Sequence, residues 1–384
     1  MSCRLVIITE IIAPYRIPVF NALALISGID LHVIFLADTD PTQREWKIYD
    51  NEIHFSYEVL PNWHTRLTRT LYLLLNRGMK SALRRNSPDV IVCGGYNYLA
   101  CWQALFWARH RNVPVLLWCE STVRELRSHP WLTKHSKQRF VHSCSGFVVP
   151  GISSRRYVAS FGIPDEEVVT APDAVDTAFF SRLADQARAG RERLQELKLP
   201  EAYFLYVGRL VREKGIFDLL TAYEKMSPQA RKQFSLLYVG DGADRAQLLQ
   251  RAVSIQPGNV HWAGFVHREQ LPAYYALAHA FVLPTWSDPW GLVVNEAMAC
   301  GLPIVVTDAA GCAADLVSNM WNGYVIPPRD VAQLSSVLQA FAADPSLSRT
   351  MGQRSRERIV QFSPEHCAEG LATAAMRFQD KARA

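Results

Sequence analysis

The sequence lacks any apolar run near the roughly 20 residues that a membrane-spanning helix needs. Its only early apolar stretch is bracketed by Arg4 and Glu10, so we expect neither a transmembrane helix nor a secretory leader. The excess of positive over negative charge is also small, with a formal net charge of +5. This excess fits an anionic ligand or a membrane surface, but it is too small to argue for a nucleic acid partner by itself.

Closely spaced cysteine pairs are missing as well. The eight cysteines are scattered along the chain, and most have apolar neighbours. This spacing predicts reduced core thiols in a cytosolic protein and argues against a zinc site or a disulfide framework.

Glycine is absent from the first predicted strand-to-helix loop, residues 10–18, which excludes a glycine-rich phosphate cradle there. Tyr15 and Arg16 lie in this loop, and Arg16 is a candidate ligand-binding charge or a solvated arginine. The next predicted strand is followed by Asp38 and Asp40. Such a pair can hold a divalent metal, but it is also common in plain turns.

The 384 residues exceed one typical domain and suggest two of roughly 190. Alternating strand and helix patterns predict an α/β protein with two doubly wound parallel sheets in tandem. We expect an N-terminal domain at 1–180, a charged linker at 181–200, a C-terminal domain at 201–362 and a last helix at 363–384. The predicted strands are 5–9, 31–36, 89–93, 113–119, 146–150 and 168–171 in the first half and 203–207, 234–239, 260–262, 280–283, 304–306 and 324–326 in the second.

The segment 284–303 joins the predicted strand 280–283 to a helix that we expect at 292–300. Gly291 and Leu292 mark the start of this helix, whose N-terminal N–H groups and partial positive charge suit a phosphate. Asp288 lies in the loop before it. Glu296 lies among apolar neighbours, where a carboxylate needs hydrogen bonds, and a sugar's vicinal hydroxyls could supply them. A loop aspartate and a solvated helix glutamate are the alternative.

The loop after the strand 203–207 reads G-R-L-V-R-E-K-G from Gly208. Arg209 can bind phosphate oxygens in a bidentate manner and Lys214 adds a mobile charge, so the loop suits a diphosphate. A polar surface loop is the alternative. Phe265 and Val266 follow the strand 260–262 at a position that is plausible for contact with a nucleobase.

Glu120 follows the buried strand 113–119, where polar side chains face the ligand in this kind of sheet; a capping or salt-bridged carboxylate is the alternative. Residues 64–85 are the most basic segment, and their apolar positions recur at three and four residues. This spacing predicts an amphipathic helix with a cationic face. Such a helix can lie on an anionic membrane surface, or it can be an ordinary surface helix.

Together these residues resemble glycosyltransferase family 4, a family of retaining nucleotide-sugar transferases with two Rossmann-like domains, the GT-B fold. The likeness is strongest over residues 203–329. It rests on the motifs G-R-L-V-R-E-K-G at Gly208, V-G-D-G at Val239, A-G-F at Ala263, the segment 284–303 and N-G-Y-V-I-P-P at Asn322. The start A-P-Y-R-I-P-V-F and the stretch A-P-D-A-V-D-T-A-F-F extend it over nearly the whole chain.

The resemblance implies that a nucleoside-diphosphate sugar is the donor and a hydroxyl group the acceptor, with no metal or other cofactor. Arg209 and Lys214 would neutralise the diphosphate, Glu296 would bind the ribose, and Asp288 would bind the donor sugar. The backbone N–H groups near Gly291 and Leu292 would contact phosphate. The donor side would also include Gly208, Phe265 and Val266, and the acceptor side Tyr15, Arg16 and Arg124. The last helix would cross back onto the N-terminal domain.

Two departures from the family pattern leave questions open. The family usually has glutamate at the position of Asp288, and many members have histidine at the position of Glu120. A hexose transferase for polysaccharide, lipopolysaccharide, glycolipid or natural-product assembly, cytoplasmic or peripheral on the inner membrane face, is the leading hypothesis. A nucleotide-sugar epimerase and a non-catalytic nucleotide-sugar-binding protein remain alternatives.

Overall fold

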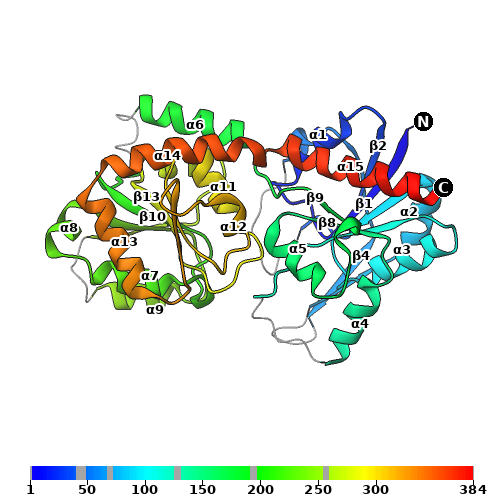
Figure 1. Cartoon of the computed structure of the whole chain (residues 1–384), viewed down its shortest axis with the longest axis horizontal. Coiled ribbons are helices and arrows are strands. Elements are labelled where there is room, and N and C mark those ends of the chain that lie inside the picture. The colour runs from blue at the N-terminus through cyan, green and yellow to red at the C-terminus, as the bar shows by residue number, and fades with distance from the viewer. Residues whose placement is uncertain are drawn as a thin grey trace. The chain divides into compact units, whose positions relative to one another are not determined.

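The computed structural model describes residues 2–39, 49–66, 72–124, 131–190, 197–253 and 259–383. The chain divides into two compact units, each with its own parallel sheet (Figure 1). Unit 1 comprises Met1–Val123, Arg127–Val175 and Ser363–Ala384, and unit 2 comprises Arg124–Leu126 and Asp176–Phe362. The predicted α/β class with two doubly wound parallel sheets is confirmed.

Unit 1 has a seven-stranded sheet in the order β3-β2-β1-β6-β7-β8-β9. All neighbouring pairs in this sheet are parallel. Its elements are β1 (Cys3–Thr9), α1 (Ile17–Ala24), β2 (Ile29–Phe35), η1 (Asp50–Glu52), β3 (Ser56–Val59), β4 (Asn62–Arg66), β5 (Tyr72–Asn76), α2 (Met79–Asn86), β6 (Val90–Cys93), α3 (Leu99–Arg109), β7 (Val115–Trp118), α4 (Trp131–Val141), β8 (Gly146–Val149), α5 (Ile152–Ala159), η2 (Asp165–Glu167), β9 (Val168–Thr170) and α15 (Pro364–Arg383).

Both faces of the unit 1 sheet are buried, because successive strand side chains point to opposite faces. Ile91 and Leu117 contribute to one core, beneath α2, α3 and α5. Val92 and Leu116 contribute to the other core, together with α1 and the apolar side of α15. The last helix therefore completes unit 1, although it follows unit 2 in the sequence.

Residues 64–85 do not form the single amphipathic helix that their spacing predicts. Instead, β4 and β5 pair as antiparallel strands, and α2 is the one helix among the described residues of this segment, 64–66 and 72–85. The run Tyr72–Asn76 has the length of a strand, and its apolar positions fit a strand as well as a helix. The expected membrane contact rested on one continuous helix with a cationic face. Because the described residues on both sides of 67–71 are strands, that expectation loses its basis.

Unit 2 has a six-stranded parallel sheet in the order β12-β11-β10-β13-β14-β15. Its elements are α6 (Thr177–Ala189), β10 (Tyr203–Val207), η4 (Arg212–Lys214), α7 (Ile216–Glu224), α8 (Pro228–Gln233), β11 (Ser235–Val239), α9 (Arg245–Ala252), β12 (Val260–Gly264), α10 (Leu271–Leu277), β13 (Ala280–Leu283), α11 (Leu292–Ala299), β14 (Ile304–Thr307), α12 (Ala313–Leu316), β15 (Gly323–Ile326), α13 (Val331–Ala343), α14 (Ser346–Ile359) and η5 (Val360–Phe362).

The strand order reverses between β10 and β13 in unit 2 and between β1 and β6 in unit 1. The loops after two such strands leave the carboxyl edge of the sheet in opposite directions, which opens a ligand crevice at that edge. The topology therefore predicts that ligands bind near residues 208–215 and 284–291 in unit 2 and near residues 10–16 in unit 1.

The stretch 181–200, expected as a linker, begins inside a regular element. Helix α6 starts at Thr177, where Asp176 caps it by accepting the N–H of Phe179 at 2.9 Å. Helix α6 packs against α10 and α11 and so belongs to unit 2. The division between the units falls between Val175 and Asp176, a few residues before the expected end of the first domain.

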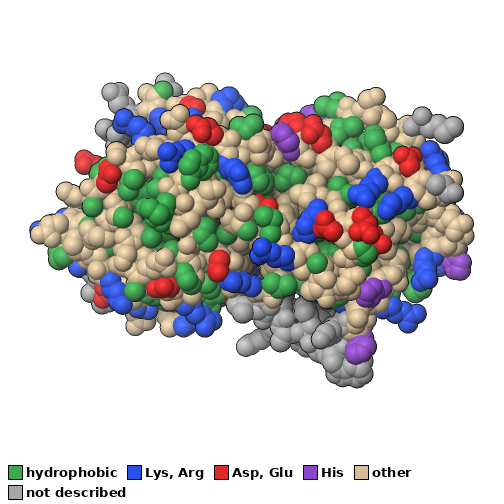
Figure 2. All heavy atoms as spheres, in the orientation of Figure 1, with side chains coloured by type: hydrophobic (Ala, Val, Ile, Leu, Met, Phe, Trp, Pro, Cys, Tyr) green, Lys and Arg blue, Asp and Glu red, His purple; other side chains and the backbone are tan. Residues whose placement is uncertain are grey.

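The helices and the surface charges bear on possible membrane and nucleic acid partners. No helix among the described residues has both the length and the apolarity to cross a bilayer. On the face shown in Figure 2, Lys and Arg side chains are interspersed with Asp and Glu side chains.

Candidate functional site

The switch point of unit 2 holds an ion pair between the two loops that leave it. The ammonium of Lys214, at the end of η4, lies 2.7 Å from a carboxylate oxygen of Asp288 in the β13–α11 loop. Their side chains are only 13% and 16% exposed. Two candidates from separate motifs are thus in contact, and the ammonium group of Lys214 lies at the carboxyl edge of the sheet.

A glycine allows these loops to approach each other. Gly215 follows Lys214 with φ +71°, and a Cβ at this position would lie 1.9 Å from the carbonyl oxygen of Pro284. The N–H of Trp286 also donates to the carbonyl of Glu213 at 2.8 Å. The last glycine of the predicted phosphate loop therefore serves backbone packing beside Lys214.

The β13–α11 loop is also fixed from the side of β14. The N–H of Gly311 donates to the carbonyl of Asp288 at 2.9 Å, and the N–H of Asp288 donates to Ala309 at 3.2 Å. Gly291 then turns the chain with φ +100° into α11, which begins at Leu292 as predicted. The N-terminus of α11 therefore lies three residues along the chain from the Lys214–Asp288 pair and adds partial positive charge to this edge.

Glu296, on the second turn of α11, accepts a hydrogen bond from the hydroxyl of Tyr275 at 2.7 Å. Tyr275 comes from α10 and is fully buried. Burial raises the pKa of the Glu296 carboxyl to about 7, although the Tyr275 hydrogen bond and the positive charge of Arg268 oppose the rise. A half-buried carboxyl that titrates near neutrality is suited to exchange hydrogen bonds with hydroxyl groups.

The remaining donor-side candidates of unit 2 are more exposed. Arg209 is paired with Glu213 at 3.6 Å, and its side chain is 59% exposed. Gly208 has φ +151° at the end of β10. Phe265 is 48% exposed at the end of β12, and Val266 follows it. The structure describes no contact that links these residues to the Lys214–Asp288 pair.

The carboxyl edge of unit 1 holds a second ion pair, between Arg16 and Glu120. Arg16 also donates to Thr9 Oγ1 at 3.2 Å, and its guanidinium stacks 4.4 Å from the centre of the Trp118 ring. Arg16 is only 8% exposed, so the interpretation as a solvated loop arginine is wrong. The guanidinium carbon of Arg16 also lies 5.8 Å from the centre of the Tyr15 ring. The arginine holds Glu120 in place at the end of β7.

Asp173 is a further buried carboxyl near this pair that sequence reasoning did not identify. It follows β9 and is 7% exposed. Burial raises its pKa well above the usual range, the charge of Glu120 adds to the rise, and Arg16 opposes it. In the sequence, Asp173 lies in the stretch A-P-D-A-V-D-T-A-F-F, which contributes to the family resemblance but does not by itself indicate a buried carboxyl.

Arg124 and the predicted metal pair, Asp38 and Asp40, have no described contact with either ion pair. Arg124 is grouped with unit 2, where its guanidinium donates to Asp308 at 2.9 Å; its predicted acceptor role stays a prediction. Asp38 is exposed after β2, and Asp40 lies outside the described residues. Within the described ranges, no group of three or more His, Cys, Asp or Glu side chains is arranged to hold a metal.

Comparison with known proteins identifies the family. A model described as glycosyl transferases group 1 matches residues 191–358, and one described as Glycosyltransferase Family 4 matches residues 21–179. The chain belongs to glycosyltransferase family 4. This family 4 chain is 28% identical over 222 residues to O-antigen chain mannosyltransferase B of Escherichia coli. The alignment covers 57% of each protein, so the chain spans little more than half the length of this relative.

Solved structures share the GT-B fold. Sucrose-phosphate synthase from Thermosynechococcus elongatus matches with a TM-score of 0.72 at 21% identity, covering 99% of both chains. HepE from Anabaena, solved in complex with UDP-glucose, matches with a TM-score of 0.72 at 17% identity and covers 97% of this chain and 99% of its own. These similarities confirm that the family 4 chain has the predicted architecture.

Proposed function

We propose that the protein transfers a sugar from a nucleoside-diphosphate sugar to a hydroxyl acceptor, in the assembly of a polysaccharide or another glycoconjugate. The observation that carries this proposal is the Lys214–Asp288 pair at the switch point of unit 2, three residues along the chain from the N-terminus of α11. A cation and a helix N-terminus are suited to a diphosphate. Family membership and the UDP-glucose complex of HepE support this donor class.

In this proposal, unit 2 lowers the barrier by stabilising the departing diphosphate. Lys214 exchanges Asp288 for phosphate oxygens when the donor binds, and Arg209, exposed at the end of β10, adds a second cation. The released Asp288 carboxylate then accepts hydrogen bonds from the donor sugar. Glu296 binds the ribose hydroxyls, and the N–H groups near Gly291 and Leu292 contact phosphate. Gly208, Phe265 and Val266 line the nucleotide side.

Unit 1 binds the acceptor in this proposal. Arg16 fixes Glu120, which accepts a hydrogen bond from the attacking hydroxyl. The bond between the sugar's anomeric carbon and the phosphate oxygen breaks while the bond to the acceptor oxygen forms on the same face of the sugar. The acceptor proton passes to the departing phosphate oxygen, so the anomeric configuration is retained without a protein nucleophile or a metal.

Thermal unfolding with UDP, GDP, ADP and CMP, each with and without EDTA, tests the donor site. A ligand that binds only the native state raises the midpoint. We expect one nucleoside diphosphate to raise it, equally with and without EDTA. A shift that disappears with EDTA would contradict metal independence and would favour a metal site at Asp38 and Asp40. No shift with any nucleotide would contradict the donor site.

Transfer assays separate the proposal from its alternatives. We expect Lys214→Ala and Arg209→Ala to lower the transfer rate by more than about tenfold, because each removes a charge-assisted contact to the leaving group. Rates within threefold of the parent would contradict diphosphate stabilisation. Isomerisation of the donor without any acceptor would support an epimerase. Donor binding with neither transfer nor slow hydrolysis would support a non-catalytic binding protein.

A further inference from the structure

The phosphate loop after β10 contains a third cation, Arg212, which the proposed donor site does not use. Arg212 and Lys214 are the first and last residues of η4, and their side chains diverge. Lys214 faces Asp288, whereas Arg212 donates to Gln247 Oε1 on α9 at 3.2 Å. The N–H of Arg212 donates to Asp244 Oδ2 at 2.7 Å, which fixes η4 against the start of α9.

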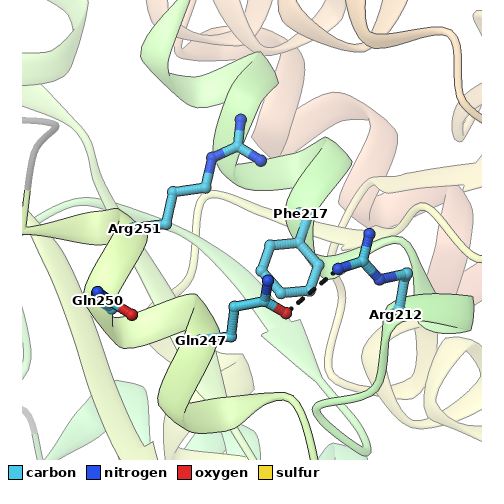
Figure 3. A pocket seen from close by; sticks show the side chains of 5 residues that line it. All are labelled: Arg212, Phe217, Gln247, Gln250 and Arg251. Atoms are coloured by element: carbon cyan, nitrogen blue, oxygen red, sulfur yellow. Dashed lines mark hydrogen bonds between the residues drawn. The ribbon is translucent and has the colours of Figure 1, made fainter.

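Arg212 lines a pocket of about 390 Å³ between η4, α7 and α9, which we call the Arg212 pocket (Figure 3). It is lined by Arg212, Phe217, Gln247, Gln250 and Arg251. Its volume lies in the lower part of the range of about 300 to 1,000 Å³ for small-ligand sites. The pocket faces α9, and Lys214 and Asp288 do not line it.

The lining has a specific chemistry. Two arginines and two glutamines lie around Phe217, and the five lining residues include no carboxylate. Arg212 and Gln247 are hydrogen-bonded to each other, so a ligand would have to take the place of this bond. The Arg212 guanidinium lies 5.0 Å from the centre of the Phe217 ring, and Phe217 is 8% exposed. On the other side, Arg251 donates to Thr221 Oγ1 on α7. Figure 3 shows Arg212 and Arg251 on opposite sides of the Phe217 ring.

We propose that the Arg212 pocket binds a small phosphorylated sugar, at a site separate from the donor site. Arginine binds phosphate through paired N–H donors, so Arg212 would hold the phosphate group. Gln247 and Gln250 lie on one face of α9 and carry both donors and acceptors, which match hydroxyl groups. Phe217 provides the apolar part of the lining, against which C–H groups of a pyranose would pack.

Binding is measured by isothermal titration and thermal unfolding with glucose 1-phosphate, inorganic phosphate and glucose as probes. We expect glucose 1-phosphate to bind and the other two to bind at least about tenfold more weakly, since each lacks half of the matching groups. Arg212→Gln should weaken glucose 1-phosphate binding about tenfold or more. Arg349→Gln, an exposed arginine on α14, is the control and should leave binding unchanged.

Two further variants keep the result independent of the donor site and of folding. Lys214→Ala should remove the shift caused by a nucleoside diphosphate and keep the binding of glucose 1-phosphate. Gln247→Leu keeps both arginines and should still weaken binding several-fold. The proposal is overturned if glucose 1-phosphate does not bind, if Arg212→Gln binds it normally, or if Lys214→Ala abolishes its binding. Equal binding of inorganic phosphate would overturn the sugar part.

Discussion

The carboxyl edges of the two sheets each hold one shielded ion pair, and the two pairs differ in what fixes their cation. In unit 1, Arg16 is held by Glu120, Thr9 and the face of Trp118. In unit 2, Lys214 has one close partner, Asp288, and a second contact to the carbonyl of Ser287 at 3.5 Å. The arginine has several fixed partners, whereas the lysine has essentially one.

This difference assigns different tasks to the two cations. A guanidinium with several directional partners is preorganised and keeps a neighbouring carboxylate in position. An ammonium on a four-carbon stem can exchange one anionic partner for another with little rearrangement. We therefore interpret Arg16 as a positioning residue for Glu120 and Lys214 as the group that exchanges Asp288 for a phosphate.

The largest effect is expected from Arg16→Met. This variant leaves Glu120 without its cation and Thr9 without its donor. Removing one member of a buried pair costs about 3 to 5 kcal/mol, and because the Glu120 side chain is 32% exposed, we expect a loss near the lower end of that range. Urea unfolding measures the loss. The control is Arg85→Ala, which breaks the Arg85–Glu58 pair in the same unit at a side chain that is 61% exposed. That variant should cost less than about 1 kcal/mol, and equal losses would contradict the special position of Arg16.

The second prediction tests whether unit 2 relies on backbone packing where unit 1 relies on side-chain partners. In Gly215→Ala the new Cβ would lie 1.9 Å from the carbonyl oxygen of Pro284, at φ +71°. Strain and displacement should together cost roughly 3 kcal/mol and weaken nucleoside-diphosphate binding. Gly264→Ala is a matched control, because Gly264 has the same φ and no atom within 4 Å of its Cβ position. It should cost only about 1 to 2 kcal/mol.

The third prediction compares two carboxyl groups. Glu120 is bonded to a guanidinium, whereas Glu296 is bonded to the hydroxyl of Tyr275. The Glu296 carboxyl, with its pKa raised to about 7, stays protonated in the folded protein at pH values where the unfolded chain has lost the proton. The folded state therefore loses stability as pH rises from about 4.5 to about 7.

Glu296→Gln removes this penalty. Relative to the parent, the variant should gain about 2 kcal/mol between pH 5 and pH 7.5, measured by urea unfolding at both values. Asp185→Asn is the control, because Arg356 and Arg188 lower the pKa of Asp185. Its carboxylate is ionised in both states over this window, so the difference from the parent should not change with pH. A constant difference for Glu296→Gln would contradict the raised pKa.

Local sequence patterns predicted most of the sheet strands and the start of α11, because buried parallel strands are continuous apolar runs bounded by turns. The helical spacing rule failed at β5, where three consecutive leucines, Leu73 to Leu75, lie in a strand that pairs with β4. A strand in a two-stranded ribbon depends on its partner, and that information is not local.

The candidate residues were predictable singly, but their contacts were not. Lys214 and Asp288 are 74 residues apart and Arg16 and Glu120 are 104 apart. A sequence reading places each of them at the end of a strand, and the strand order then decides which ends meet. Asp173 was missed because its significance comes from burial beside Glu120 and Arg16, which no spacing pattern encodes.

The smallest stability effect is expected when both members of the unit 2 pair are replaced, in Lys214→Met with Asp288→Leu. Replacing a whole shielded ion pair by apolar groups of similar size is often neutral, because the lost attraction is offset by the lost desolvation cost. The double variant should unfold within about 1 kcal/mol of the parent and should bind no nucleoside diphosphate. The corresponding double variant of unit 1, Arg16→Met with Glu120→Leu, should lose more stability, because Thr9 loses its hydrogen-bond donor and the Trp118 ring loses the guanidinium that stacks on it. Similar losses in the two double variants would show that the extra partners of Arg16 contribute nothing, and the distinction between a fixed and an exchangeable cation would then fail.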